Sequence, residues 1–415
     1  MPVGHHPSLP LPSIDDFTPS RMVPVSREWP ARADGRPREL WIVEEIFVHY
    51  RIPVWDRIAQ RLGDGWRLRV FADPEQSEKS IRTARTYFEP QRTPFSLGGR
   101  VYRWPGLLAR IRAERPAAVF ASATPRCLTV WRLPGACRAA GAALVAWTKG
   151  HRELDTPGGA TDRVRIGVLR RFDAIVCYGQ SARKDLLRHG LPEDRLFVAQ
   201  NSIDTARIFE QRAALLAEGE RLRRVPRLEG RRVLLYCSTM FPKKRQLDLV
   251  EAWPFLRDRF PDLVLVFVGG GEMLDAVRAR ASQVDAARIK VMGRVPEGAD
   301  YHWIAACDIA VQCGGLGLAI NQYLAFGKPT LVADEPGVDG EFVLDGVTGF
   351  RYEKGDPRAL ADAVARMLED PPRTARIAET GRELVRTSGN IDRMVDGVFE
   401  ALEFCRVRRG ERGGS

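Results

Sequence analysis

The segment from Val311 to Pro329, with the sequence VQCGGLGLAINQYLAFGKP, constrains the fold of this chain most strongly. An apolar run leads into a glycine-rich turn, the turn leads into the start of a helix, and a Gly-Lys-Pro sequence ends that helix. Glycine turns of this kind stand at the carboxyl ends of strands in open α/β sheets, where ligands bind. The open backbone N–H groups of a helix start can hold an anion or a sugar hydroxyl. Taken alone, the segment is equally compatible with a tight loop that needs flexible residues.

The same alternation of short apolar strands and helical segments runs through the 415 residues twice. Such alternation predicts parallel sheets covered by helices, and the length allows two domains of ordinary size. We therefore expect an α/β fold made of two Rossmann-like, doubly wound domains. The expected parts are a disordered Pro-rich extension (1–36), an N-terminal Rossmann-like domain (37–205), a charged, helix-prone linker (206–228), a C-terminal Rossmann-like domain (229–385), a helix crossing back to the N-terminal domain (386–405) and a loose tail (406–415).

Composition narrows the class of protein and its surroundings. Hydrophobic residues make up 44% and charged residues 28%, as in a globular protein, and no apolar run reaches the length of a membrane span. The N-terminus lacks the basic and apolar regions of a secretory signal. The seven cysteines are scattered without Cys-x-x-Cys pairs, which favours buried, reduced thiols over disulfides or zinc. We expect a cytoplasmic protein with no bound metal.

The net charge of +11 favours acidic partners such as nucleotides or phospholipid headgroups. No nucleic-acid motif accompanies this charge, so we do not expect nucleic acid as a partner. A peripheral contact with the inner face of a membrane is compatible with the basic surface. The oligomeric state is not legible in the sequence.

Loops rich in glycine or in cationic residues follow the predicted strands of the second half. One loop carries three cations, Lys243, Lys244 and Arg245, and glycines fill the turns at 269–271 and 314–317. Parallel strands deliver these loops to one edge of the sheet. Backbone donors, close approach and fixed cations are what binding of a nucleotide diphosphate requires. A solvated basic turn and ordinary strand-to-helix turns remain the alternative explanation. No Walker phosphate loop occurs.

Taken in order, these segments resemble the GT-B glycosyltransferases of the retaining family 4. The run KKRQLDLVEAW is similar to the family's K-K-R-x-D-x-L-I-x-A, and Val268-Gly269-x-Gly271 to its V-G-x-G. The segment from Val291 to Val295 matches another family motif, and Gly315 to Pro329 matches G-F-G-L-x-x-x-E-A-x-A-x-G-x-P. The likeness covers roughly residues 38–385. It implies two domains that face each other across a cleft.

The resemblance also implies a donor and its binding residues. The donor would be a nucleotide-diphosphate sugar of the UDP, GDP or dTDP type, transferred with retention and without a cofactor. Lys244 falls on the family's diphosphate lysine and is our first catalytic candidate. The other expected donor-binding residues are Thr239, Lys243, Arg245, Gly271, Gly293, Arg294, Val295, Gly314, Gly315, Leu316, Gly317, Leu318 and Gln322.

The chain departs from the family pattern at several of these positions. Gly314 and Gln322 stand where the family has two glutamates, and this variation fits a diverged subgroup better. Thr239 replaces the arginine that usually joins the diphosphate lysine, and Arg245 is a candidate substitute. The family's sugar-side histidine aligns with Lys149 or, one turn away, with His151, so both are catalytic candidates.

The first half offers two groups of acceptor-side candidates. His49, Tyr50 and Arg51 follow its first strand, and Trp147 precedes Lys149 after a middle strand. Histidines at such places are often structural instead. Glu44 and Glu45 are adjacent on a strand, so their side chains point to opposite faces and make a poor acid–base pair.

The sequence therefore predicts a glycosyltransferase that moves a sugar from a nucleotide-diphosphate donor to a small-molecule acceptor. The acceptor could be a glycan, a lipid-linked glycan or a natural product. Two alternatives remain: an epimerase-like enzyme that acts on a nucleotide sugar without an acceptor, and a non-catalytic protein that binds one. The loss of both family glutamates is the feature that favours the non-catalytic alternative.

Overall fold

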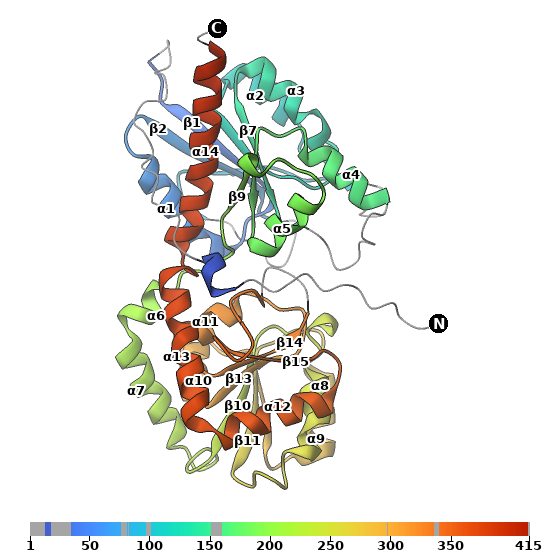
Figure 1. Ribbon diagram of the computed structural model, residues 1–415, viewed down its shortest axis with the longest axis vertical. Helices are drawn as coiled ribbons and strands as arrows, with labels where there is room; N and C mark the ends of the chain where they lie inside the picture. The colour runs from blue at the N-terminus through green and yellow to red at the C-terminus, as the bar shows by residue number, and fades with distance from the viewer. Residues whose placement is uncertain are drawn as a thin grey trace. The chain divides into compact units, whose positions relative to one another are not determined.

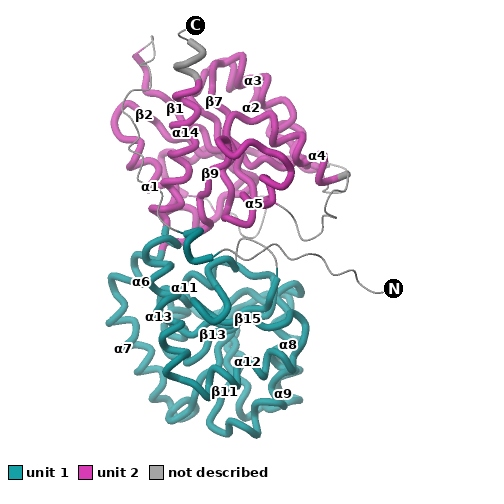
Figure 2. The backbone as a smooth tube through the Cα atoms, in the orientation of Figure 1, with its two compact units in different colours: residues 1–18, 205–390 teal, residues 19–204, 391–415 magenta. Residues whose placement is uncertain are grey.

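The computed structural model describes residues 13–17, 35–75, 81, 83–96, 101–150, 160–296, 298–335 and 340–413. The chain forms two compact units (Figure 2). Unit 1 comprises residues 1–18 and 205–390, and unit 2 comprises residues 19–204 and 391–415. Each unit contains one parallel sheet with helices packed against it (Figure 1).

The sheet of unit 2 has seven strands in the order β3-β2-β1-β6-β7-β8-β9, and all of its pairs are parallel. Its strands are β1 (Arg38–Ile46), β2 (Trp66–Asp73), β3 (Phe88–Pro90), β6 (Ala118–Ser122), β7 (Ala143–Thr148), β8 (Ala174–Cys177) and β9 (Leu196–Val198). A separate antiparallel pair consists of β4 (Phe95–Ser96) and β5 (Val101–Tyr102). The helices are α1 (Ile52–Leu62), α2 (Leu107–Glu114), α3 (Leu133–Ala140), α4 (Ala160–Leu169), α5 (Gln180–Arg188) and α14 (Ile391–Gly413), with short 3-10 turns η2 (His49–Arg51), η3 (Val130–Arg132) and η4 (Glu193–Arg195).

Alternation along β1 divides the core of unit 2 between two faces. Leu40 and Ile42 lie in a buried cluster with residues of α1 and α14, which places those helices on one face of the sheet. Trp41 points to the other face, where its ring packs against Phe71. Successive side chains of a strand point to opposite faces of the sheet. Because both faces are buried here, consecutive residues are apolar, as the sequence shows.

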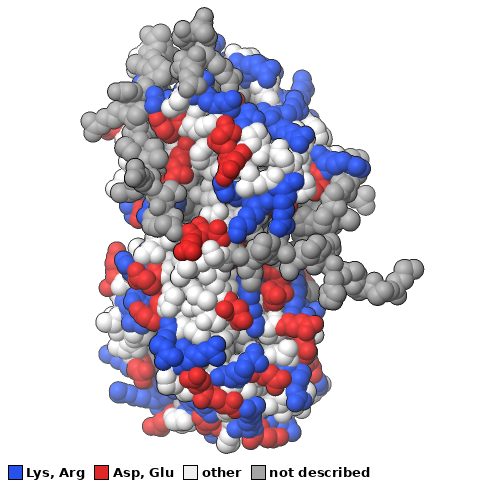
Figure 3. All heavy atoms as spheres, in the orientation of Figure 1, with Lys and Arg blue, Asp and Glu red and all other residues white. Residues whose placement is uncertain are grey.

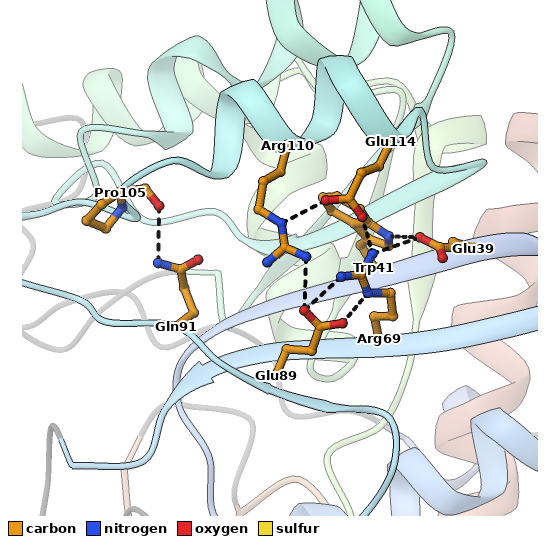
Figure 4. Close-up of polar contacts among 8 residues, drawn as sticks. All are labelled: Glu39, Trp41, Arg69, Glu89, Gln91, Pro105, Arg110 and Glu114. Atoms are coloured by element: carbon orange, nitrogen blue, oxygen red, sulfur yellow. Dashed lines mark hydrogen bonds and ion pairs between the residues drawn. The ribbon is translucent and has the colours of Figure 1, made fainter.

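A charged network fixes α2 to the edge of this sheet (Figure 4). Arg69 of β2 pairs with Glu39, Glu89 and Glu114, and its guanidinium lies 4.9 Å from the Trp41 ring centroid. Arg110 of α2 reaches Glu89 and Glu114 as well. Burial alone would raise the pKa of the Glu89 carboxyl, but hydrogen bonds from Arg69 and Arg110 hold it below its ordinary value. The pairing compensates charges that are largely removed from water.

The sheet of unit 1 has six strands in the order β12-β11-β10-β13-β14-β15, again all parallel. Its strands are β10 (Arg232–Cys237), β11 (Leu263–Val268), β12 (Ile289–Gly293), β13 (Ile309–Gln312), β14 (Thr330–Asp334) and β15 (Phe350–Glu353). The helices are α6 (Ala206–Glu210), α7 (Arg212–Arg223), α8 (Leu247–Ala252), α9 (Leu274–Asp285), α10 (Ala299–Ala306), α11 (Ala319–Ala325), α12 (Pro357–Glu369) and α13 (Pro371–Thr387), with 3-10 turns η1 (Ile14–Phe17), η5 (Pro242–Lys244) and η6 (Trp253–Phe255).

Two apolar clusters fill the two faces of this sheet. Leu234 and Tyr236 of β10 belong to the cluster shared with α8, α9 and α12, whereas Val233 and Leu235 belong to the cluster shared with α10, α11 and α13. Helices on both faces of a parallel sheet are the doubly wound arrangement. The predicted fold class, with two Rossmann-like α/β domains, is confirmed.

The ends of the units depart from our expected boundaries. Residues 206–223, which we assigned to a linker, form α6 and α7, and α7 packs on α10. The fit there is close, because a Cβ added to Gly219 would lie 2.7 Å from Ala305. This segment is therefore part of unit 1. The final helix α14 begins at Ile391 and packs on α1, β7, β8 and β9 of unit 2.

The expectation of a disordered N-terminal extension is corrected at residues 13–17. The Phe17 side chain is buried, and its ring centroid lies 5.2 Å from that of Phe342. The Ser388 hydroxyl donates to the Phe17 carbonyl at 2.7 Å. The sequence did not predict this docking because one aromatic residue in a Pro-rich stretch shows no periodicity.

Candidate functional site

The cationic turn after β10 lies at the carboxyl edge of the unit 1 sheet. Lys244 ends the 3-10 turn η5 and is 8% exposed, whereas Lys243 is exposed. Arg245 adopts a left-handed backbone conformation with φ of 50°, which is rare for a residue other than glycine. Its guanidinium is held by Asp248 through contacts of 2.7 and 3.1 Å, and this pairing raises the pKa of Arg245.

The glycine-rich loop after β13 packs directly against that cationic turn. A Cβ on Gly314 would lie 3.1 Å from the Lys243 carbonyl oxygen, and a Cβ on Gly315, which has φ of 48°, would lie 2.9 Å from it. A Cβ on Gly317 would lie 3.2 Å from Lys244 Nζ. The ammonium of Lys244 therefore stands beside the backbone of the loop. Side chains at these positions would separate the two segments.

The turn after β11 makes a similar close approach. Gly269 and Gly271 have φ of 131° and 149°, and added Cβ atoms would lie 2.0 Å from the Ser238 oxygen and 2.3 Å from the Met240 oxygen. Both positions thus require glycine for conformation and for space. Thr239 lies between these contacts with an exposed side chain, while its carbonyl accepts from the Tyr236 hydroxyl at 3.0 Å.

The remaining donor-side candidates lie on the next strand ends. Gly293 ends β12 with φ of 74°, and the exposed Arg294 places its Nε 3.5 Å from a Cβ built on Gly270. Val295 is partly buried and packs against the apolar cluster of α10 and α11. Leu318 is the N-cap of α11, and Gln322 lies half-buried within this seven-residue helix. Tyr323 beside it bonds to the backbone of Cys237 at the end of β10.

Glu335 is a neighbour of the loop that the sequence did not single out. It follows β14 directly, is 5% exposed, and accepts a hydrogen bond from the Leu316 N–H at 2.6 Å. Its second carboxylate oxygen lies 2.5 Å from Lys354 Nζ. The signal that could have found it is its place in the run DEPG at the end of an apolar strand.

The carboxyl edge of the unit 2 sheet is built around Arg51. Its guanidinium donates to Asn201 Oδ1 at 2.7 Å and lies 5.0 Å from the ring centroid of the buried Trp147. The rings of Tyr50 and Tyr178 lie 5.5 and 5.6 Å away. A cation enclosed by aromatic faces in this way is held by their quadrupoles. Trp147 and Arg51, which belong to two separate groups of acceptor-side candidates, are therefore in contact, and both are buried.

The other candidates of unit 2 differ in exposure. Lys149 is exposed and places its Nζ 5.3 Å from the Tyr178 ring, and His49 is exposed with its ring edge-on to Tyr50. His151 lies outside the described residues. Burial raises the pKa of Glu44 to about 7, since it outweighs the opposing effect of Arg51, and Glu45 adds to the rise. This carboxyl, to which the sequence gave little weight, thus titrates near neutrality.

Two features are absent from the described residues. No group of three or more His, Cys, Asp or Glu side chains in that part of the chain could hold a metal ion. None of the helices within the described ranges is both long enough and apolar enough to cross a membrane.

Both halves of the chain are similar to known glycosyltransferases. Residues 55–207 match the family model Glycosyltransferase Family 4, and residues 219–384 match the model Glycosyl transferases group 1. The GDP-mannose-dependent alpha-(1-6)-phosphatidylinositol monomannoside mannosyltransferase of Mycolicibacterium smegmatis is 32% identical over 262 residues, which cover 60% of this chain and 67% of that protein. The enzyme of the same name from Mycobacterium tuberculosis is 29% identical over 301 residues, which cover 69% of this chain and 74% of that protein.

Solved structures show the same architecture. Anabaena Alr3699/HepE in complex with UDP has a TM-score of 0.67 with 19% identity, covering 88% of this chain and 99% of that chain. Together with the two parallel sheets, this likeness defines a two-domain α/β protein of the GT-B fold. The chain belongs to the family 4 glycosyltransferases, and the prediction of a glycosyltransferase is confirmed.

Proposed function

We propose that the protein transfers a sugar from a nucleotide-diphosphate donor to an acceptor hydroxyl, with retention at the anomeric carbon. The observation that carries this proposal is the convergence of the Lys243–Arg245 turn with the loop from Gly314 to Leu318. This convergence combines fixed cations with closely approaching backbone, as a diphosphate requires. Unit 1 would hold the donor, and unit 2 would supply most of the acceptor contacts.

The chemistry assigned to unit 1 is stabilisation of the leaving group. The bond between the anomeric carbon and the diphosphate oxygen breaks, the acceptor oxygen bonds to that carbon, and the acceptor hydroxyl loses its proton. Negative charge therefore grows on the departing diphosphate. A partly buried ammonium beside it stabilises that charge more in the transition state than in the ground state, and we assign this role to Lys244. Arg245 would contribute less directly, because Asp248 already holds its guanidinium.

GDP-mannose is the first donor to test, because both mannosyltransferase relatives carry that donor in their names. We propose that the reaction needs no divalent metal, since the Lys243–Arg245 turn supplies positive charge. For the acceptor side we assign Lys149, His49 and Tyr50, with Arg51 and Trp147 forming the floor beneath them. The acceptor class stays open between a glycan, a lipid-linked glycan and a natural product.

We further propose that unit 2 is the part that meets anionic partners. Residues 101–204 contain 17 Lys and Arg but nine Asp and Glu, so most of the net charge of +11 resides there. Figure 3 shows blue side chains gathered over the part of unit 2 that carries α4 and α5. Leu128 and Trp131 are exposed between Arg126 and Arg132, a combination that suits the headgroup region of a membrane.

The proposal is tested in two steps with the purified protein. Thermal shift measurements with GDP, UDP and dTDP identify the nucleotide, because a ligand that binds the native state raises the melting temperature. The matching donor sugar is then supplied with and without candidate acceptors, in the presence and absence of EDTA. Transfer to an acceptor supports the proposal. Failure of all three nucleotides to bind would refute it, and donor conversion that leaves no transferred product would favour the epimerase-like alternative.

A further inference from the structure

A buried carboxylate binds the glycine-rich loop of unit 1 at Leu316, between the two glycines that abut Lys243 and Lys244. Glu335 accepts the Leu316 N–H at 2.6 Å, and Lys354 Nζ contacts its other carboxylate oxygen at 2.5 Å. The Glu335 side chain is 3% exposed, whereas the Lys354 side chain is 36% exposed. The carboxylate is thus enclosed, and the lysine that neutralises it reaches solvent.

The Leu316 N–H does not need a buried carboxylate as its hydrogen-bond acceptor. The residues from Gly315 to Leu318 are only partly buried, so water could satisfy the Leu316 N–H. An enclosed carboxylate is expensive to desolvate and is tolerated only when it is paired and hydrogen-bonded. A charged acceptor also fixes the direction of a backbone donor more firmly than water does.

The loop is therefore held by two supports. The Lys243 carbonyl and the Lys244 ammonium abut Gly315 and Gly317, and Glu335 holds Leu316 between them. Leu316 also covers Gly340, because a Cβ on that glycine would lie 2.5 Å from its Cδ1 atom. A shift of the loop at Leu316 would move its backbone relative to Lys244.

We propose that Glu335 is a positioning residue of the donor site, and that Lys354 keeps its charge from repelling a bound diphosphate. This inference rests on the proposed function, because it concerns the same site in unit 1. Glu335 acts through the Leu316 N–H and does not itself touch the substrate. The pair carries no net charge, so it holds the loop without adding negative potential beside an anion.

The test measures binding of GDP, GMP and UDP by titration calorimetry. Glu335→Ala removes the acceptor and should weaken GDP binding about tenfold. Glu335→Gln keeps an oxygen for the Leu316 N–H and should bind GDP within about twofold of the unmodified protein. Lys354→Met leaves a lone carboxylate, so it should weaken GDP binding more than GMP binding, and adding Glu335→Gln to it should restore binding.

Asp308 provides the matched control at the opposite edge of the same sheet. Its Oδ2 atom accepts the Val233 N–H at 2.6 Å and pairs with Arg223 at 2.8 Å, and its side chain is 36% exposed against 3% for Glu335. Asp308→Ala should lower the melting temperature as Glu335→Ala does, yet leave nucleotide binding unchanged. Equal binding by Glu335→Ala and the unmodified protein would overturn the inference, as would equal weakening by both alanine variants. If the unmodified protein bound none of GDP, UDP and dTDP, the proposed function itself would fail.

Discussion

Units 1 and 2 are built on sheets of the same type but carry different chemistry at the carboxyl ends of their strands. In each unit the first long strand, β1 or β10, lies inside the sheet, with the next strand on one side and a later strand on the other. In unit 1 this edge consists of glycine turns beside Lys244. In unit 2 it consists of Arg51 enclosed by aromatic rings, with the titrating carboxyl of Glu44 nearby.

This difference shows that the same type of sheet can carry different residues at the carboxyl ends of its strands. The apolar alternation that builds both sheets does not involve the turns, so a few residues after each strand decide what the edge can bind. Unit 1 exposes backbone through glycine and thereby suits an anion. Unit 2 instead places the guanidinium of Arg51 and its surrounding aromatic rings there.

The largest expected effect is on catalysis by unit 1. Lys244→Ala should lower the turnover of the donor by two to three orders of magnitude, because in the proposed reaction this ammonium stabilises the charge of the leaving diphosphate. Steady-state kinetics with the donor found by thermal shift would measure this effect. Lys290→Ala is the control, since Lys290 lies on β12, its Nζ donates to the Ala286 carbonyl after α9, and its loss should leave the turnover unchanged. An unchanged rate for Lys244→Ala would remove the role assigned to this lysine.

The next prediction compares two glycines of unit 1 that both have a positive φ, of which only Gly269 is crowded by neighbouring atoms. Gly269→Ala should destabilise the protein by about 3 kcal/mol or more, because the new methyl group would collide with the Ser238 carbonyl. Gly298 also has a positive φ, of 83°, but an added Cβ would meet no atom of the described chain within 4 Å. Gly298→Ala should therefore destabilise by only about 1 kcal/mol. Urea unfolding of both variants tests this, and equal losses would contradict the close approach.

A third variant tests whether a change in unit 2 leaves nucleotide binding unaffected. Arg51→Met should destabilise the protein by about 2 kcal/mol, because Asn201 loses a charged donor and three rings lose their cation. Nucleoside diphosphate binding should stay within about twofold of the unmodified protein. Calorimetry on the folded variant would check this, and a large loss of nucleotide affinity would break the division of labour between the units.

The smallest effect depends on pH. The pKa of Glu44 is raised from 4.5 to about 7, so the native state binds a proton that the unfolded state releases between these values. Stability should therefore fall as pH rises from about 5 to 8. Glu44→Gln removes this loss, and its advantage over the unmodified protein should grow as the pH rises through that range. Arg51, Glu45, Tyr102 and Cys127 are the nearby titratable groups. Melting temperatures of both proteins at several pH values measure this advantage. A difference between them that does not change with pH would show that Glu44 does not titrate in this range.

The sequence predicted the parts of the site that short segments define. The apolar run ending at Cys237 is β10, and the glycines after Val268 and Cys313 do form turns at one sheet edge. The sequence did not predict contacts between distant segments, such as those of Arg51 with Asn201 and of Leu316 with Glu335. A side chain that acts through a partner far along the chain leaves no local periodicity to read.

What the sequence determined by itself is the α/β class, the division into two Rossmann-like halves and the family. The class and the two halves depend on hydrophobic alternation and on glycines that local backbone geometry requires, both of which are written in consecutive residues. The family rests on the likeness of the chain's motifs to those of known members. Only the tertiary structure decided that residues 206–223 pack as helices on unit 1, that Arg245 is held by Asp248, and that an enclosed carboxylate supports the glycine-rich loop. Burial and charge pairing are properties of the folded chain, because they arise where segments meet in space.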